Sequence, residues 1–200
     1  MVRVVVEGLE LVPDAPGVIL ASNHLSVVDP PLLSVLVARA VGRRVRYMAK
    51  AEAMAMPVVG TVLRAYGGFA VRRGQADREA YRAARAVLTA GDWLGLAPEG
   101  TRSRTAQLGE PKPGVAMLAL RTGALVLPVG ISGSERTWPI GAHLPRPFTT
   151  ITVRFGQPYR PGDGLPLQRS APRRGLEDET EALMHRIAEL LPLAYRGRYR

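Results

Sequence analysis

A histidine and an aspartate five residues apart could form a catalytic pair near the start of the chain. They stand in the segment Asn23-His24-Leu25-Ser26-Val27-Val28-Asp29, between a predicted strand and a predicted helix. Because five residues of continuous helix turn by about 500°, His24 and Asp29 can meet only if the chain turns between them. A neutral imidazole accepts protons, and a carboxylate on its other ring nitrogen fixes the tautomer and stabilises the cation that forms. The spacing favours general-base chemistry, while a simpler alternative has His24 bonding a carbonyl and Asp29 capping the helix.

No nucleophile for such a base is evident in the chain itself. Serine hydrolases add a serine on a strained glycine turn to the same pair, a pattern that this sequence does not display. The chain has no cysteine, which excludes a thiol nucleophile, a disulfide framework and a thiolate metal site. Its histidines, His24, His143 and His185, are too scattered for a metal cluster, which disfavours a metal-dependent hydrolase using His24, Asp29 and Glu99. We therefore expect a substrate hydroxyl to be the nucleophile.

Two other segments combine arginine with glycine where predicted strands end. In Pro98-Glu99-Gly100-Thr101-Arg102-Ser103, Arg102 and backbone amides could bind a phosphate while Glu99 orients an acceptor hydroxyl or the arginines. The segment Gly67-Gly68-Phe69-Ala70-Val71-Arg72-Arg73-Gly74 places two arginines among glycines in a similar way. Taken singly, the first is equally compatible with an ordinary charged turn and the second with a solvated face.

Taken together, these segments resemble the lysophosphatidic acid (1-acylglycerol-3-phosphate) acyltransferase family of glycerolipid acyltransferases. The family's His-x-x-x-x-Asp block is complete as His24 to Asp29, and its later blocks resemble Gly67 to Arg73, Glu99 to Ser103 and Val126 to Gly130, in that order. The resemblance extends over residues 17–132, about where we expect the motif-bearing core.

The resemblance implies a function and a role for each site residue. His24 would take the proton from an acceptor hydroxyl that attacks the thioester of acyl-CoA or acyl carrier protein, and Asp29 would orient His24. Most typically the acceptor would be 1-acylglycerol-3-phosphate, a lysophospholipid, and the product phosphatidic acid; a different lipid or glycolipid acceptor is the alternative. No cofactor and no metal are expected. The implied substrate-binding residues are Arg73, Glu99, Gly100, Thr101 and Arg102, and the implied pocket-shaping residues are Asn23, Gly67, Lys112 and Pro128.

The order of predicted elements indicates an α/β fold. We expect strands over residues 2–12, 17–21, 45–49, 68–71, 93–97, 125–131 and 150–155, and helices over residues 30–37, 52–65, 77–90, 115–122 and 177–191. This alternation predicts one domain over residues 1–200, with a mixed, largely parallel sheet covered by helices, as in glycerolipid acyltransferases. Residues 158–175, rich in Pro, Gly and Arg, are predicted to form a surface excursion.

The charge of the chain narrows the classes of partner. A formal net charge of +10 attracts polyanions, whether nucleic acid, anionic lipid or a phosphorylated substrate. Only 6% of the residues are aromatic and no basic-aromatic run is evident, so we expect no nucleic-acid partner. A non-enzymatic domain that binds polyanions or lipids is the alternative from another class.

Contact with a membrane is expected to be peripheral. The chain has no stretch of about 18 uninterrupted apolar residues, and Glu7 stands too early for a signal peptide, so we expect a cytoplasmic protein at the inner face of the cell membrane. The Met- and Val-rich residues 51–63 could present an apolar surface, with Arg39, Arg43, Arg44 and Arg46 docking anionic headgroups. The alternative is that residues 51–63 are the core side of an ordinary helix.

Overall fold

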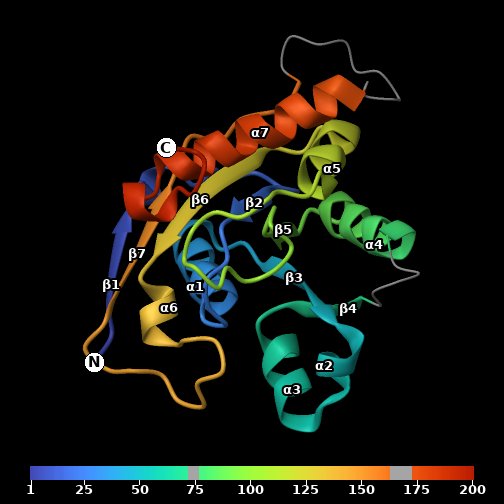
Figure 1. The fold of residues 1–200 in the computed structure, drawn as a ribbon. Helices are drawn as coiled ribbons and strands as arrows, with labels where there is room; N and C mark the ends of the chain where they lie inside the picture. Colours follow the sequence, from blue (N-terminus) through green and yellow to red (C-terminus); the bar gives the residue numbers. More distant parts are fainter. Residues whose placement is uncertain (72–76, 163–172) are drawn as a thin grey trace.

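One seven-stranded sheet runs through the protein. The computed structural model describes residues 1–71, 77–162 and 173–200 (Figure 1). The strands lie in the order β1-β7-β6-β2-β5-β3-β4, and every neighbouring pair is parallel except β6 and β7. This confirms the predicted α/β fold with a mixed, largely parallel sheet. The strands are β1 (Arg3–Glu7), β2 (Ile19–Ser22), β3 (Val45–Lys50), β4 (Gly68–Val71), β5 (Trp93–Leu96), β6 (Val126–Ser132) and β7 (Thr150–Phe155).

Helices cover both faces of the sheet. Ile19 on β2 joins the apolar cluster that includes residues of α4, α5 and α7, whereas the next residue, Leu20, joins the cluster under α1. Successive strand residues are therefore buried on opposite faces, as is usual for parallel strands. The helices are α1 (Asp29–Val41), α2 (Ala51–Ala55), α3 (Pro57–Ala65), α4 (Asp77–Thr89), α5 (Gly114–Thr122), α6 (Ser134–Thr137) and α7 (Arg173–Glu189), with short 3₁₀ turns η1 (Leu9–Leu11) and η2 (Leu193–Tyr195).

Two element predictions are wrong in the first third of the chain. The single helix expected over residues 52–65 is two helices, because Met56 is extended (φ −70°, ψ 131°) before Pro57, and a residue that precedes proline avoids the helical conformation. The strand expected over residues 2–12 ends at Glu7, where Gly8 takes a left-handed conformation (φ +72°) and η1 follows.

The predicted excursion over residues 158–175 is described only at its ends. Tyr159 pairs with Val126 in an antiparallel bridge, and residues 173–175 already belong to α7. Residues 163–172 lie outside the described part of the chain.

The parallel strands fix where functional side chains can gather. Strands β2, β3, β5 and β6 all run in the same direction, so their carboxyl ends lie at one edge of the sheet. Residues 23–28, helix α2, residues 97–113 and residues 133–149 follow these four ends. At this edge the Asn23 amide donates to the Ile131 carbonyl (2.8 Å) and accepts from the Ile131 N–H (2.7 Å), which fastens the end of β2 to β6. The motif segments that are far apart in the sequence therefore meet here.

Among the residues that the structure describes, no helix is both long and apolar enough to cross a bilayer.

Candidate active site

His24 and Asp29 form a hydrogen-bonded pair in the turn between β2 and α1. His24 Nδ1 lies 2.9 Å from Asp29 Oδ2, and the same oxygen accepts the backbone N–H groups of Leu25 and Ser26, each at 2.7 Å. The Asp29 side chain is only 2% exposed, whereas the His24 ring is partly exposed. Because the carboxylate occupies Nδ1, that nitrogen carries the ring proton and Nε2 is left to accept another.

The alternative in which Asp29 caps helix α1 is wrong, and the same hydrogen bonds explain why. Helix α1 begins at Asp29 itself, Val28 is its flanking residue, and no side chain caps it. The Asp29 carboxylate instead points back along the chain, where it accepts the N–H groups of the preceding turn. The turn that the spacing required is therefore held by one oxygen of Asp29.

Glu99 fastens a second loop to this turn. Its Oε1 accepts the His24 N–H at 3.3 Å and its Oε2 accepts the Gly109 N–H at 2.9 Å, while the Ser103 N–H donates to the His24 carbonyl at 2.8 Å. Burial raises the pKa of the Glu99 carboxyl, and the two amide donors oppose that effect. Both oxygens are engaged by backbone amides, so in this geometry Glu99 positions the loop rather than an acceptor hydroxyl.

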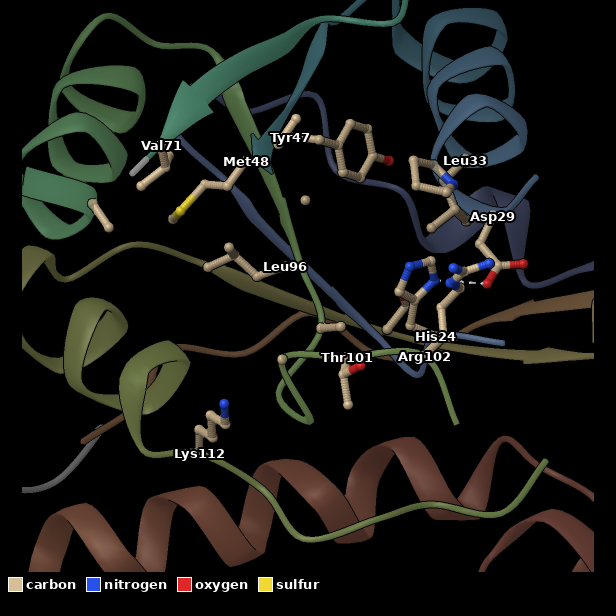
Figure 2. A pocket seen from close by; sticks show the side chains of 17 residues that line it. His24, Asp29, Leu33, Tyr47, Met48, Val71, Leu96, Thr101, Arg102 and Lys112 are labelled. Carbon is tan, nitrogen blue, oxygen red and sulfur yellow. Dashed lines mark hydrogen bonds and ion pairs between the residues drawn. The ribbon is translucent and has the colours of Figure 1, made fainter. Parts of the chain in front are cut away.

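A cavity of about 680 Å³ opens beside the His24–Asp29 pair (Figure 2). Six of the residues predicted from sequence line it, namely His24, Asp29, Gly100, Thr101, Arg102 and Lys112. Within the described residues, the side chains of Arg102 and Lys112 make no hydrogen bond or ion pair, so both cations are free to hold an anionic group. In the same part of the chain, no three His, Asp or Glu side chains gather as metal ligands.

The cavity continues into an apolar region that sequence reasoning missed. Figure 2 shows Met48, Val71 and Leu96 around the end of the cavity away from Asp29, while the Tyr47 ring lies beside Leu33 on the wall nearer Asp29. A Cβ atom on Gly95 would lie 2.1 Å from Tyr47 Cε1, so only glycine leaves room for this ring. Burial raises the pKa of the Tyr47 phenol, which keeps it neutral in that wall. A glycine inside the apolar strand 93–96 was the one available signal of this close approach.

Three of the residues predicted to shape the pocket, Asn23, Gly67 and Pro128, do not line the cavity. Asn23 fastens β2 to β6 as described above. A Cβ atom on Gly67 (φ +81°) would lie 2.5 Å from the Val45 carbonyl oxygen, so this position requires glycine at the start of β4. Pro128 is buried in β6, where it pairs with Ala21 of β2. The remaining predicted phosphate-binding residue, Arg73, lies outside the described residues.

The family of the chain follows from comparison with known proteins. The family model described as "Acyltransferase" matches residues 3–132, more than half of the chain and all of the predicted site residues. The chain belongs to the acyltransferase family. Its fold is shared with the crystal structure of the 1-acyl-sn-glycerophosphate (LPA) acyltransferase PlsC from Thermotoga maritima, with a TM-score of 0.66 at 26% identity over 94% of this chain and 72% of that chain.

Three of the curated proteins that are similar in sequence are named 1-acyl-sn-glycerol-3-phosphate acyltransferase. The chloroplastic enzyme of Arabidopsis thaliana is 28% identical over 70% of this chain and 39% of its own length. The enzyme of Borreliella burgdorferi is 31% identical over 64% of this chain and 50% of its own length. The enzyme of Pseudomonas aeruginosa is 29% identical over 82% of this chain and 62% of its own length. This acyltransferase chain thus spans between 39% and 62% of these relatives.

We expect Glu99→Ala to lower the free energy of unfolding by about 1–3 kcal/mol, because two backbone N–H groups in a buried site lose their acceptor. Urea unfolding followed by circular dichroism measures the change. The matched control is Glu110→Ala, which removes an exposed carboxylate from the same loop and should cost less than about 0.5 kcal/mol. Equal losses for the two variants would contradict the positioning role of Glu99.

Proposed function

We propose that this chain is an O-acyltransferase that moves a fatty acyl group from a thioester to a hydroxyl of a lysophospholipid. The donor is acyl-CoA or acyl carrier protein, the acceptor is 1-acylglycerol-3-phosphate, and the product is phosphatidic acid. One observation carries the proposal: an imidazole held by a buried carboxylate lines the same cavity as two free cations and a set of apolar side chains. The names of the relatives support the same reaction.

The pair of His24 and Asp29 supplies the proton transfers. His24 Nε2 takes the proton from the acceptor hydroxyl as its oxygen attacks the thioester carbonyl carbon, and Asp29 stabilises the imidazolium. The tetrahedral intermediate collapses with cleavage of the carbon–sulfur bond, and the leaving thiolate takes the proton back from His24. The acyl group passes directly between substrates, so no acyl-enzyme is needed. Holding both substrates in the cavity supplies several kcal/mol of barrier reduction.

The two ends of the cavity suit the two ends of the substrates. Arg102 and Lys112 lie on the polar wall and offer guanidinium and ammonium donors to the acceptor phosphate, which places its hydroxyl beside His24. The apolar wall of Leu33, Met48 and Leu96 favours a hydrocarbon chain, because burial of each CH₂ contributes about 0.8 kcal/mol. Since such acceptors reside in bilayers, the chain works as a peripheral protein, and we place it at the cytoplasmic face of the cell membrane.

Pure protein incubated with acyl-CoA and a panel of lysophospholipids and glycolipid acceptors should form acylated lysophosphatidic acid, detected by mass spectrometry. His24→Ala should lower kcat by a factor on the order of 10² to 10⁴, because the general base is lost. The matched control is His143→Ala, which removes an exposed histidine and should leave kcat unchanged. A His24→Ala protein as active as the wild type would remove His24 from the mechanism, and product from another acceptor alone would replace the proposed substrate.

Arg102→Ala should raise the KM for the lysophospholipid about tenfold while changing the KM for acyl-CoA little, because a charge-assisted contact with the acceptor phosphate is lost. Steady-state kinetics with each substrate varied in turn measure the two constants. Arg104→Ala is the matched control, since Arg104 is exposed and does not line the cavity. Unchanged kinetics in Arg102→Ala would remove its role in binding phosphate.

Met48→Trp should shift the preferred donor towards shorter acyl chains, because the larger side chain fills part of the apolar cavity. Competition between acyl-CoA donors of different length, with products resolved by mass spectrometry, measures the preference. Met48→Leu has about the same volume as the wild-type side chain and should preserve the wild-type profile. If Met48→Trp folds with an unchanged profile, the acyl chain does not occupy this region.

A further inference from the structure

Helix α3 turns its apolar stripe outwards. Val58, Val59, Val62 and Tyr66 follow helical spacing along one side, and all four are exposed, Val58 to 76%. On the opposite side, Gly60 is buried so tightly that a Cβ atom would lie 2.1 Å from the Met54 carbonyl oxygen. A helix of a globular protein normally buries its apolar stripe, so α3 has the reverse orientation. The alternative that these exposed residues form the core side of an ordinary helix is therefore wrong.

A second group of exposed apolar side chains lies in residues 138–149, after α6. Leu144 is 77% exposed, Phe148 is 89% exposed, and Ile140 is exposed as well. More than half of the large apolar side chains that are exposed in the described residues belong to this loop or to the hairpin of α2 and α3. Single exposed apolar residues are ordinary, but such grouping marks an interaction surface.

Both groups lie at the edge of the sheet that carries the active site. The hairpin follows the carboxyl end of β3 and the loop follows that of β6, while His24 follows β2 and Glu99 follows β5. Figure 1 shows the hairpin and the loop reaching the same, lower end of the molecule. We call the exposed apolar residues of these two segments the carboxyl-edge surface: Met56, Val58, Val59, Val62, Tyr66, Ile140, Leu144 and Phe148.

We propose that the carboxyl-edge surface docks on an anionic bilayer interface, with the hairpin and the loop inserted on either side of the site. This inference rests on the acyltransferase function proposed above, since a lipid acceptor would then enter the cavity without leaving the membrane. Two protrusions from distant parts of the chain match a plane better than a single peptide or helix partner. Amphipathic segments bind a bilayer by burying their apolar face about 5–10 Å into the boundary of headgroups and acyl chains.

The charges beside the carboxyl-edge surface favour anionic lipid. Residues 51–66, 97–113 and 133–149 carry six Arg or Lys residues and four Glu residues, within a chain of net charge +10. Of these acids, Glu99 is buried, and Glu110 and Glu135 each lie within ion-pair distance of an arginine. Exposed cations such as Arg146 therefore dominate the field that a membrane meets, and each contributes about 1 kcal/mol close to an anionic surface.

Flotation with phosphatidylcholine vesicles, with and without phosphatidylglycerol, tests the proposal. The wild type should bind the vesicles that contain phosphatidylglycerol. Val58→Asp/Val62→Asp and, separately, Leu144→Asp/Phe148→Asp should each lower the partition coefficient about tenfold or more, because they replace inserted apolar groups by carboxylates. Leu193→Asp is the matched control, since Leu193 is 65% exposed on η2 and belongs to neither the hairpin nor the loop, so this variant should bind like the wild type. Wild-type protein that does not float, or Asp variants that float equally well, overturns the proposal.

Two further measurements separate the possible causes. Turnover of a short-chain, water-soluble lysophosphatidic acid without vesicles should be unchanged in the Asp variants, because none of the four residues lines the cavity. If the wild type does not turn over this substrate at all, the proposed function is refuted. If the Asp variants keep their turnover and also float as well as the wild type, only the proposed docking surface is refuted. Light scattering tests a second copy as occupant: a wild-type dimer that the Asp variants dissociate, with flotation unaffected, overturns the bilayer proposal. Milder Val58→Ser/Val62→Ser variants replace any Asp variant that circular dichroism finds unfolded.

Discussion

One carboxylate oxygen holds the turn on which the site depends. Asp29 Oδ2 accepts hydrogen bonds from His24 Nδ1–H and from the backbone N–H groups of Leu25 and Ser26, at distances of 2.9, 2.7 and 2.7 Å. The two amides fix the carboxylate before any proton moves, so the ring is oriented by a group that need not reorganise during the reaction. Charge-assisted hydrogen bonds in a buried setting are strong, and removing their acceptor would release both the turn and the imidazole. The same hydrogen bonds to Asp29 therefore hold the turn and orient the imidazole.

The parallel sheet adds a second constraint, because the catalytic and binding side chains must come from several different loops. Each parallel strand contributes only the segment after its carboxyl end, so no single loop can supply base, cations and apolar wall. Glu99, in the loop after β5, accepts hydrogen bonds from the backbone N–H groups of His24 and Gly109 and so joins this loop to the turn after β2. The Asn23 side chain makes two hydrogen bonds with the Ile131 backbone and so joins the end of β2 to β6. These buried polar contacts keep the loops in register with one another.

Local geometry could be predicted from the sequence where short motifs determine it. The turn between His24 and Asp29 and the strand over residues 68–71 both follow from residue types within a few positions. The fold class followed from the alternation of strands and helices. The order of strands and the apolar region of the cavity did not, because Leu33, Met48 and Val71 meet only through pairing of β3 with β4 and packing of α1. Contacts of that kind leave no local pattern.

Helix α3 illustrates the limit of periodicity as a guide. A 3.6-residue repeat of valines predicts an apolar stripe, but the same repeat arises whether the stripe faces a core or a membrane. Two features outside the repeat decide the direction. The extended residue Met56 separates the two helices, so that α3 begins at Pro57, and Gly60 has no side chain, so that α3 packs closely against the Met54 carbonyl. Because α3 packs most closely through Gly60 on its polar side, the valines on its other side remain exposed. The stripe is therefore a consequence of the hairpin's internal packing, and it lies at the edge where lipid substrates would arrive.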